Sequence, residues 1–296
     1  MERLAAFALR ITTRMFSFLS VAAGRRVAKL LVAVVRRFGS ESERITKINL
    51  KRCFSELDDA ALERLSRASL HHTLCIMIEN GMLTHWSERR IREAIVSEEG
   101  KGLIEAQLAK PRGVLVLLPH FGNWEVIGCA LGDLGFVGLY DPPRIASLDA
   151  LIRRSRERFG GTLVPVDRNG LRSVYKTLKN HGLVCLLPDQ VPEQNAGVYA
   201  PFFGQPALTM TLVHRLIRQS QPFVVLGGVR RVTGGFAIQY VPLGDALYGA
   251  DAEKSAAALN RAIEQLVRTD PAQYQWEYKR FKKQPEGHAN VYPKAP

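Results

Sequence analysis

A histidine and a glutamate stand five positions apart in the segment His120-Phe-Gly-Asn-Trp-Glu125, which directly follows an apolar run. Asn123 is a residue type favoured at helix starts, so a helix is predicted to begin at Trp124 and to carry Glu125 in its first turn. Gly122 permits a bend before that helix. We therefore predict that Glu125 folds back onto the imidazole of His120 and leaves one ring nitrogen free to take a proton from a hydroxyl. Such a dyad suits direct attack of an alcohol on a thioester.

A second segment repeats the pattern around His120. Residues 113–120 read Gly-Val-Leu-Val-Leu-Leu-Pro-His, and residues 182–189 read Gly-Leu-Val-Cys-Leu-Leu-Pro-Asp. Each is a short apolar run typical of a buried parallel strand, followed by proline and one titratable residue. If the two strands are parallel, His120 and Asp189 emerge at the same edge of the sheet, where sites in such folds lie. Asp189 is interpreted either as a residue that orients an arginine of the site or the molecule that carries the attacking hydroxyl, or as a turn residue after proline.

Other chemistries lack their patterns in this sequence. A metal site needs two or more His or Cys ligands at short spacing, and His120 has none nearby. The Gly-x-Ser-x-Gly elbow of serine hydrolases, the Walker loop and the Gly-x-Gly-x-x-Gly motif are also absent. We expect no metal and no cofactor. A structural histidine at a strand end remains the alternative interpretation of His120.

Strand and helix patterns alternate along the rest of the chain. Apolar or alternating runs predict strands at 113–118, 136–140, 162–166, 183–187 and 223–229, and an antiparallel or edge strand at 236–241. Helices are predicted at 58–86, 124–134, 148–159, 171–179 and 252–268. This order predicts an α/β fold in which helices flank a mostly parallel central sheet, as a single domain over residues 41–296.

Residues 1–40 form a basic and apolar arm. The net charge is +13, and residues 1–52 hold 12 Lys and Arg against 3 Glu. The aliphatic content favours an anionic membrane surface over nucleic acid as the partner. The longest uncharged run, Met15–Gly24, is shorter than the roughly 20 residues of a membrane span. We therefore expect an amphipathic helix that lies in the membrane interface, with basic residues along one face: Arg3, Arg10, Arg14, Arg25, Lys29 and Arg36. The alternative is a helix that packs on the domain and leaves its arginines in water.

The segment from His120 to Glu125 resembles a known family. It fits the His-(four residues)-acid motif of glycerolipid-type acyltransferases, and the full string resembles the late acyltransferases of lipid A biosynthesis, the lauroyl and myristoyl transferases of Gram-negative bacteria. Further blocks resemble that family in the same order: 49–54 (Asn-Leu-Lys-Arg-Cys-Phe), 156–160 (Arg-Glu-Arg-Phe-Gly), 187–190 (Leu-Pro-Asp-Gln), 202–204 (Phe-Phe-Gly) with Thr209, 273–276 (Gln-Tyr-Gln-Trp) and 280–282 (Arg-Phe-Lys).

The resemblance implies transfer of a fatty acyl group from acidic acyl carrier protein to a hydroxyl of a lipid A precursor, at the cytoplasmic face of the bacterial inner membrane. His120 would be the general base and Glu125 its partner. Arg156 and Arg158 would contact an acceptor phosphate or brace the site, although a solvated basic face is the alternative for Arg156. Backbone N–H groups near Gly122 would hold the oxyanion.

One departure from the family leaves the acceptor open. The family usually shows Tyr-Arg-Pro after the strand that follows the dyad, whereas this chain has Tyr140-Asp141-Pro142 and a base only at Arg144. A different glycolipid, an aminolipid or a lysophospholipid is therefore an alternative acceptor. A non-catalytic lipid-binding protein on the same fold is a more remote alternative.

Overall fold

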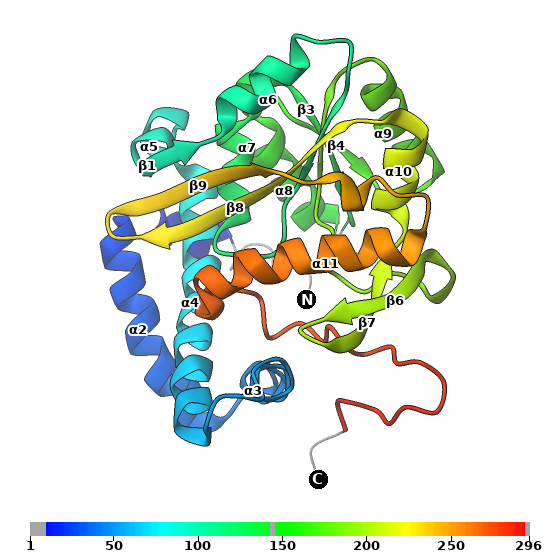
Figure 1. Cartoon of the computed structure of the whole chain (residues 1–296). Helices are drawn as coiled ribbons and strands as arrows, with labels where there is room; N and C mark the ends of the chain where they lie inside the picture. Colours follow the sequence, from blue (N-terminus) through cyan, green and yellow to red (C-terminus); the bar gives the residue numbers. More distant parts are fainter. Residues whose placement is uncertain (1–9, 143–145, 294–296) are drawn as a thin grey trace.

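A seven-stranded sheet forms the centre of the computed structural model, which describes residues 10–142 and 146–293 (Figure 1). The strand order is β1 (Ile95–Glu99), β9 (Gly235–Pro242), β8 (Phe223–Val232), β2 (Val114–Leu117), β5 (Leu183–Leu186), β3 (Phe136–Tyr140) and β4 (Thr162–Pro165). The strands from β8 to β4 run parallel, β9 is antiparallel to β8, and β1 is parallel to β9. The prediction of an α/β fold with a mostly parallel sheet is confirmed.

Helices cover both faces of this sheet, which explains why its central strands read as unbroken apolar runs. In β2, Leu115 and Leu117 pack into one core while Val114 and Val116 pack into the other. The first core is closed by α3 (Glu41–Cys53), α9 (Arg168–Lys179), α10 (Leu212–Ser220) and α11 (Ala252–Thr269). The second is closed by α2 (Val21–Phe38), α4 (Asp59–His85), α5 (Glu88–Glu93), α6 (Lys101–Leu108) and α7 (Ile127–Ala130).

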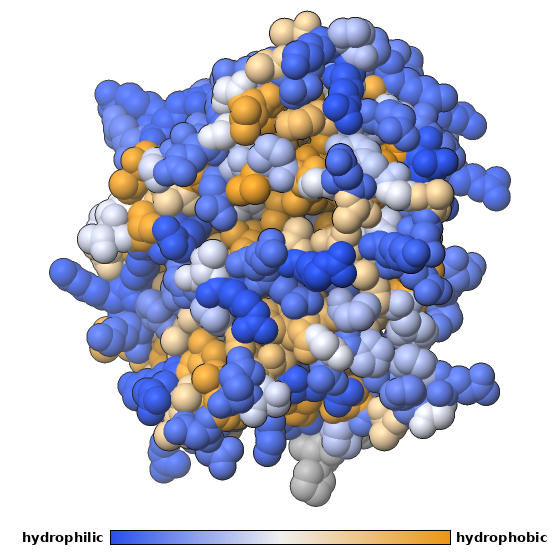
Figure 2. Space-filling view, in the orientation of Figure 1, coloured by the Kyte–Doolittle hydropathy of each residue, from blue (hydrophilic) through white to orange (hydrophobic). Residues whose placement is uncertain are grey.

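Two sides of the molecule frame the site. In Figure 1, α2 and α4 lie at the left, and α9 and α10 lie at the right. Between them α8 (Ala146–Glu157) contacts α4, α7 and β4. Hydrophilic side chains cover most of the face in Figure 2, and hydrophobic ones gather mainly in its middle.

The helix predicted at 124–134 is wrong as a continuous element. The chain instead forms a 3₁₀ turn at Trp124–Val126, the short α7, and a second 3₁₀ turn at Gly132–Leu134. Glycines weaken a helix, and Gly132 allows a close approach, since a Cβ there would lie 2.2 Å from the Phe159 carbonyl oxygen. The strand predicted at 236–241 as antiparallel or at the edge is β9, which is antiparallel to β8 and is not at the edge because β1 pairs with it.

Several elements escaped the sequence patterns. These are α3, α5, α6, β1, and an antiparallel hairpin of β6 (Gly197–Phe202) and β7 (Gln205–Met210). The hairpin turns through Phe203 and Gly204, which both have positive φ, at 49° and 71°. Positive φ at both positions is typical of a two-residue hairpin loop. Phenylalanine is not a residue type favoured in such loops, so the sequence does not predict the turn.

The N-terminal region packs on the domain in part. Helix α2 begins after the N-cap Ser20 and buries Val21, Gly24, Ala28 and Val32, of which Val21 and Ala28 belong to the core that includes α4. Arg25 was expected on an exposed basic face, but it donates hydrogen bonds to Glu79 and to the carbonyls of Val232 and Gly235. This expectation is wrong for Arg25, because a carboxylate and two strand carbonyls offer it partners.

The opposite face of α2 is exposed and partly apolar. Leu30, Val34 and Phe38 repeat at helical spacing on it, all more than half exposed. No helix in the described part of the chain is long and apolar enough to cross a membrane. The first nine residues of the predicted arm, which include Arg3, lie outside the described residues. Arg144 also lies outside them.

Candidate active site

His120 and Asp189 meet at the carboxyl edge of the sheet. Strands β2 and β5 pair in parallel with Leu117 opposite Leu186, so the two prolines and the two titratable residues follow side by side. Nδ1 of His120 lies 2.7 Å from Oδ1 of Asp189, and the backbone N–H of His120 donates to Oδ2 at 2.8 Å. Because a carboxylate accepts hydrogen bonds, Nδ1 carries the proton and Nε2 keeps its lone pair. The prediction that both side chains emerge at one edge is confirmed.

The Asp189 carboxylate is held ionised although it is only 2% exposed. Burial alone raises the pKa of Asp189, but the electrostatic interaction with His120 and the two hydrogen bonds that His120 donates lower that pKa below the usual range. Tyr274 is buried beside it, and burial together with the Asp189 carboxylate raises the pKa of this phenol well above its usual value. Asp189 therefore acts as a fixed anion behind the imidazole.

Glu125 faces Arg156. The Nε atom of Arg156 donates to Oε2 of Glu125 at 2.7 Å, and a second guanidinium nitrogen donates to Oε1, which makes a bidentate ion pair. Desolvation lowers the pKa of the Arg156 guanidinium, but the adjacent carboxylate outweighs it, and the pKa lies above the usual value. The expected contact between Glu125 and the imidazole of His120 is therefore wrong. The short 3₁₀ turn directs the carboxylate to α8, and Asp189 supplies the partner of His120.

Asn123 and Gly122 anchor the loop between histidine and glutamate. Asn123 accepts a hydrogen bond from the Glu125 N–H at 3.2 Å, which confirms its predicted capping position, and it also donates to buried Glu79 at 3.0 Å. Gly122 has a φ of +60°, and a Cβ there would lie 1.6 Å from the Val229 carbonyl oxygen. Only glycine fits this contact.

The N–H groups of Gly122 and Asn123 have partners within the protein. The Gly122 N–H donates to the Gln273 carbonyl at 2.8 Å, and the Asn123 N–H donates to the Val229 carbonyl at 3.1 Å. The expectation that N–H groups near Gly122 would hold an oxyanion is therefore wrong for Gly122 and Asn123 in this geometry. The C-terminal segment also supports His120, whose carbonyl accepts from the Gln275 N–H at 3.0 Å.

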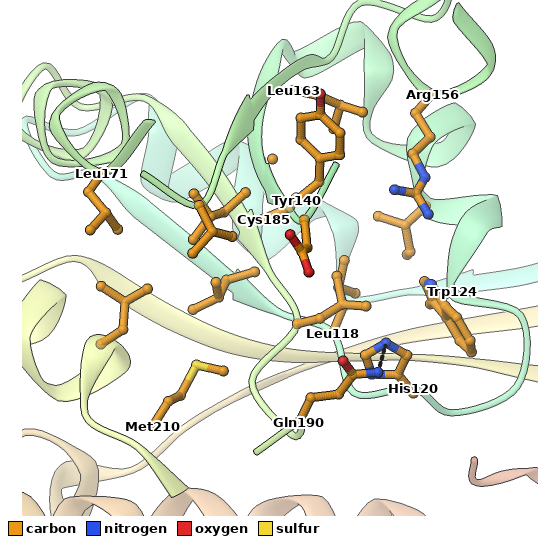
Figure 3. Close-up of a pocket in the computed structure, with 18 of the residues that line it drawn as sticks. Leu118, His120, Trp124, Tyr140, Arg156, Leu163, Leu171, Cys185, Gln190 and Met210 are labelled. Carbon is orange, nitrogen blue, oxygen red and sulfur yellow. Dashed lines mark hydrogen bonds between the residues drawn. The ribbon is translucent and has the colours of Figure 1, made fainter. Parts of the chain in front are cut away.

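An apolar cavity of about 530 Å³ opens beside His120 (Figure 3). Its volume lies in the range of ligand-binding cavities. Aliphatic and aromatic side chains dominate its wall, with few polar groups among them. The wall includes Leu118, Trp124, Ile127, Phe136, Gly138, Leu139, Tyr140, Leu163, Leu171, Cys185, Leu186, Leu187, Met210 and Leu212, with His120, Glu125, Asp141, Arg156, Gln190, Glu193 and Arg215 as polar members. This composition suits a fatty chain whose reactive end lies at His120.

Gln190 and Trp124 complete the surroundings of the imidazole, and neither was predicted as a site residue. The Gln190 Nε2 lies 3.1 Å from Nε2 of His120, marked by the dashed line in Figure 3, and its amide donates to the ring lone pair. The Trp124 ring contacts the imidazole edge to face, with ring centroids 4.6 Å apart. The sequence signal that could have identified Gln190 as a site residue is its position directly after Asp189.

The two arginines predicted for the site separate. Arg156 lines the cavity through its pair with Glu125. Arg158 donates instead to the Leu83 carbonyl, lies over the Phe159 ring at 4.3 Å, and does not line the cavity. The site role predicted for Arg158 is thus not supported by its position. Arg156 lies in the last turn of α8, whereas Arg158 lies in the turn that follows the helix, where it bonds to α4.

An α/β fold with an imidazole–carboxylate pair at the mouth of an apolar cavity defines a class of protein able to acylate a hydroxyl. Comparison with known proteins gives the family. Residues 2–283 match the model of the bacterial lipid A biosynthesis acyltransferases, and the chain belongs to this family. It is therefore an acyltransferase.

Individual relatives agree with this assignment. The lipid A biosynthesis palmitoleoyltransferase of Escherichia coli (strain K12) is 27% identical over 88% of this chain and 85% of the relative. The lauroyltransferase of the same organism is 28% identical over 86% of this chain and 84% of its own. A lipid A biosynthesis acyltransferase of Haemophilus influenzae is 27% identical over 84% and 80%.

Proposed function

We propose that this acyltransferase moves a fatty acyl group from acyl carrier protein to a hydroxyl of a lipid A precursor, with His120 as general base and Asp189 as its partner. The observation that carries the proposal is the paired imidazole: Asp189 holds Nδ1 at 2.7 Å, and His120 itself lines the apolar cavity. A fixed carboxylate orients the ring and stabilises the imidazolium that forms when Nε2 takes a proton.

The reaction then needs no covalent enzyme intermediate. Nε2 of His120 removes the proton of the acceptor hydroxyl while the oxygen attacks the thioester carbonyl carbon. The carbon–sulfur bond breaks, the ester forms, and the imidazolium returns its proton to the thiolate that leaves. The products are an acylated lipid and the free thiol of the carrier.

Gln190 is proposed as the donor to the oxyanion. Its amide lies 3.1 Å from the ring nitrogen where the hydroxyl must approach, and the backbone N–H groups of Gly122 and Asn123 are engaged elsewhere. When the acceptor displaces this amide from the imidazole, its N–H remains close to the reacting carbonyl oxygen. A donor placed there stabilises the developing negative charge.

Basic residues beside the cavity support an acidic carrier protein as the donor. Exposed cations without an ion-pair partner among the described residues lie on α9 and α10: Arg168, Arg172, Lys176, Arg215 and Arg218. Arg215 itself lines the cavity, and the other cations lie on the same two helices, whose Leu171 and Leu212 also line it. A positive surface at this place would steer a negatively charged partner and its thioester toward His120.

Association with an anionic membrane surface is proposed for the N-terminal region. The exposed apolar side chains Leu30, Val34 and Phe38 of α2 lie among exposed cations such as Arg26 and Lys29. This combination favours a peripheral position at the cytoplasmic face of the bacterial inner membrane. The lipid acceptor would be reached there.

The acceptor is tested by mass spectrometry of lipid A from cells with and without the gene. We expect the loss of one acyl chain, restored by the wild type and not by His120→Ala. Because Asp141 lines the cavity, a cationic aminolipid is the second candidate acceptor. Unchanged lipid A with an altered aminolipid or other lipid would favour that alternative. Full activity of purified His120→Ala would refute the general-base role, and wild-type protein without activity on any lipid would favour a non-catalytic lipid-binding protein.

A further inference from the structure

A second cavity of about 390 Å³ lies between α4 and α8, and no residue of α9 or α10 lines it. Its wall is largely apolar and includes Met77, Leu83, Ile91, Leu151, Ile152 and Phe159, with Thr13, Thr84 and Ser155 as small polar members. His120 lines the first cavity and is not among the residues that line the second. The second cavity is therefore a separate binding volume, within the size range of ligand sites.

The two cavities share Glu125, Gly128 and Arg156. Their common wall therefore consists of the bidentate ion pair and a residue without a side chain. A Cβ at Gly128 would meet nothing closer than 3.6 Å, so the space beside it is open. A polar head group at this wall can contact Arg156 while a hydrocarbon chain extends into the second cavity.

The outer part of the second cavity adjoins exposed apolar surface. Met77 lines the cavity and is 64% exposed, and Thr13 lies on the helical segment 10–16 that also carries the exposed Ile11 and Met15. Large exposed apolar side chains of this kind are expected at a surface that contacts lipid. By contrast, the helices α9 and α10 beside the first cavity carry exposed cations that have no ion-pair partner among the described residues. The two entrances therefore differ in chemistry.

One polar group in the second cavity lacks a partner. The Asn80 side-chain oxygen is buried and has no hydrogen-bond partner among the described residues, and Asn80 lines the wall. Buried polar atoms are normally hydrogen-bonded. A hydroxyl or amide hydrogen on a bound lipid would satisfy this oxygen.

We propose that the second cavity binds a hydrocarbon chain of the lipid acceptor, with the acceptor head group at the Glu125–Arg156 pair. The donor acyl chain then occupies the first cavity. This inference rests on the proposed function, and it assigns the two lipid substrates to two entrances: the acceptor arrives from the membrane-facing side near Met77, and the carrier-bound donor arrives from the side of α9 and α10. Both reach the Glu125–Arg156 pair, which lines the two cavities, and His120 lines the first.

The test separates acceptor binding from donor binding. Ser155→Phe and Thr84→Phe each place a ring in the second cavity from a different helix, whereas Leu163→Phe narrows the first cavity and serves as the matched control. The substrates are a lipid A precursor and acyl carrier proteins loaded with chains of different length. We expect both second-cavity variants to raise the acceptor KM by about tenfold with the donor KM within about twofold. Leu163→Phe should instead shift preference to shorter donor chains. An unchanged acceptor KM in both second-cavity variants would overturn the proposal.

A second readout needs no turnover. A lipid A precursor with a photoreactive diazirine near the end of one chain is crosslinked to wild-type protein without donor, and the labelled peptides are mapped by mass spectrometry. Labels in residues 77–84 and 151–159 are expected, and they should fall several-fold in Ser155→Phe. Labels confined to β3 and β4 would place the acceptor chain in the first cavity and overturn the assignment. Because crosslinking is read without acyl transfer, its outcome is independent of whether the proposed reaction occurs.

Discussion

Nδ1 of His120 lies 2.7 Å from Oδ1 of Asp189, although 69 residues separate them in the chain. The contact exists because two short strands with matching ends pair in register, Val114 opposite Leu183 and Leu117 opposite Leu186. A histidine whose ring is fixed by a buried carboxylate from a neighbouring strand is the arrangement that general-base catalysis requires.

Replacement of Asp189 by asparagine should strongly lower turnover. The neutral amide removes the charge that stabilises the imidazolium and no longer enforces the tautomer, and the corresponding change in serine proteases costs about 10⁴-fold. We expect kcat to fall by about 10²- to 10⁴-fold, with KM for both substrates nearly unchanged. Steady-state kinetics with acyl carrier protein and a lipid A precursor measure this.

Glu125→Gln is the comparison for Asp189→Asn. Its carboxylate contacts Arg156, so this variant should mainly raise the KM of the acceptor and reduce kcat less than Asp189→Asn does. If Glu125→Gln abolished turnover while Asp189→Asn left it intact, the assignment of Asp189 as the partner of His120 would be wrong.

Gln190→Ala should lower kcat through loss of the oxyanion donor. Removal of one such donor costs about 10²- to 10³-fold in other enzymes. Gln190→Glu should be less active still, because a carboxylate repels the developing negative charge. Gln194→Ala is the control, since Gln194 is exposed and donates to Tyr199 instead. If Gln190→Ala were fully active, its amide would serve only to cover the ring nitrogen.

Glu79→Gln should destabilise the fold. Glu79 is buried and pairs with Arg231 at 2.7 Å and with Arg25 at 3.2 Å, while Asn123 donates to the same carboxylate. Loss of its charge leaves two cations partly unpaired, and a broken buried pair costs about 3–5 kcal/mol. The free energy of unfolding from urea titration measures this.

The control for Glu79 is Glu63→Gln. Glu63 also pairs with two cations, Arg36 and Lys47, but its side chain is 44% exposed. Surface pairs contribute about 0–1 kcal/mol, so this variant should unfold nearly as the wild type does. An equal loss of the free energy of unfolding in the two variants would mean that the buried Glu79 network stabilises the fold no more than a surface ion pair does.

His72 should make stability depend on pH. Burial, together with the charge of Arg231, lowers the pKa of His72 from 6.5 to about 3. Between these two values the unfolded chain binds a proton that the folded chain does not, so stability falls as the pH decreases from 6.5 toward 3. The slope for one group is at most about 1.4 kcal/mol per pH unit.

Unfolding titrations at several pH values between 4 and 7 check this sign. His72→Gln removes the titrating group, so the difference in stability between variant and wild type should move in favour of the variant as the pH falls. A difference that stays constant over this range would show that His72 titrates alike in both states.

The elements that could be predicted from the sequence are those whose residues share one kind of surroundings along the whole element. Strands β2, β3, β4, β5 and β8 have branched apolar runs because helices cover both faces, and α4 and α11 carry helical periodicity over many turns. The elements that were missed are short or half-exposed, such as β1 and the hairpin of β6 and β7. The local sequence preference of these segments for a strand is weak, so their structure is determined by tertiary contacts.

The sequence by itself determined the class of the fold, the family, and the position of His120 and Asp189 at one edge of the sheet, because parallel pairing of two similar strands leaves their ends little freedom. Only the tertiary structure decided which carboxylate the imidazole meets. Glu125 is close to His120 along the chain, but the 3₁₀ turn and the ion pair with Arg156, a residue of α8, direct the Glu125 carboxylate away from His120. The partner of a side chain is set by the direction in which the backbone presents it and by the charges it meets, and spacing along the chain fixes neither.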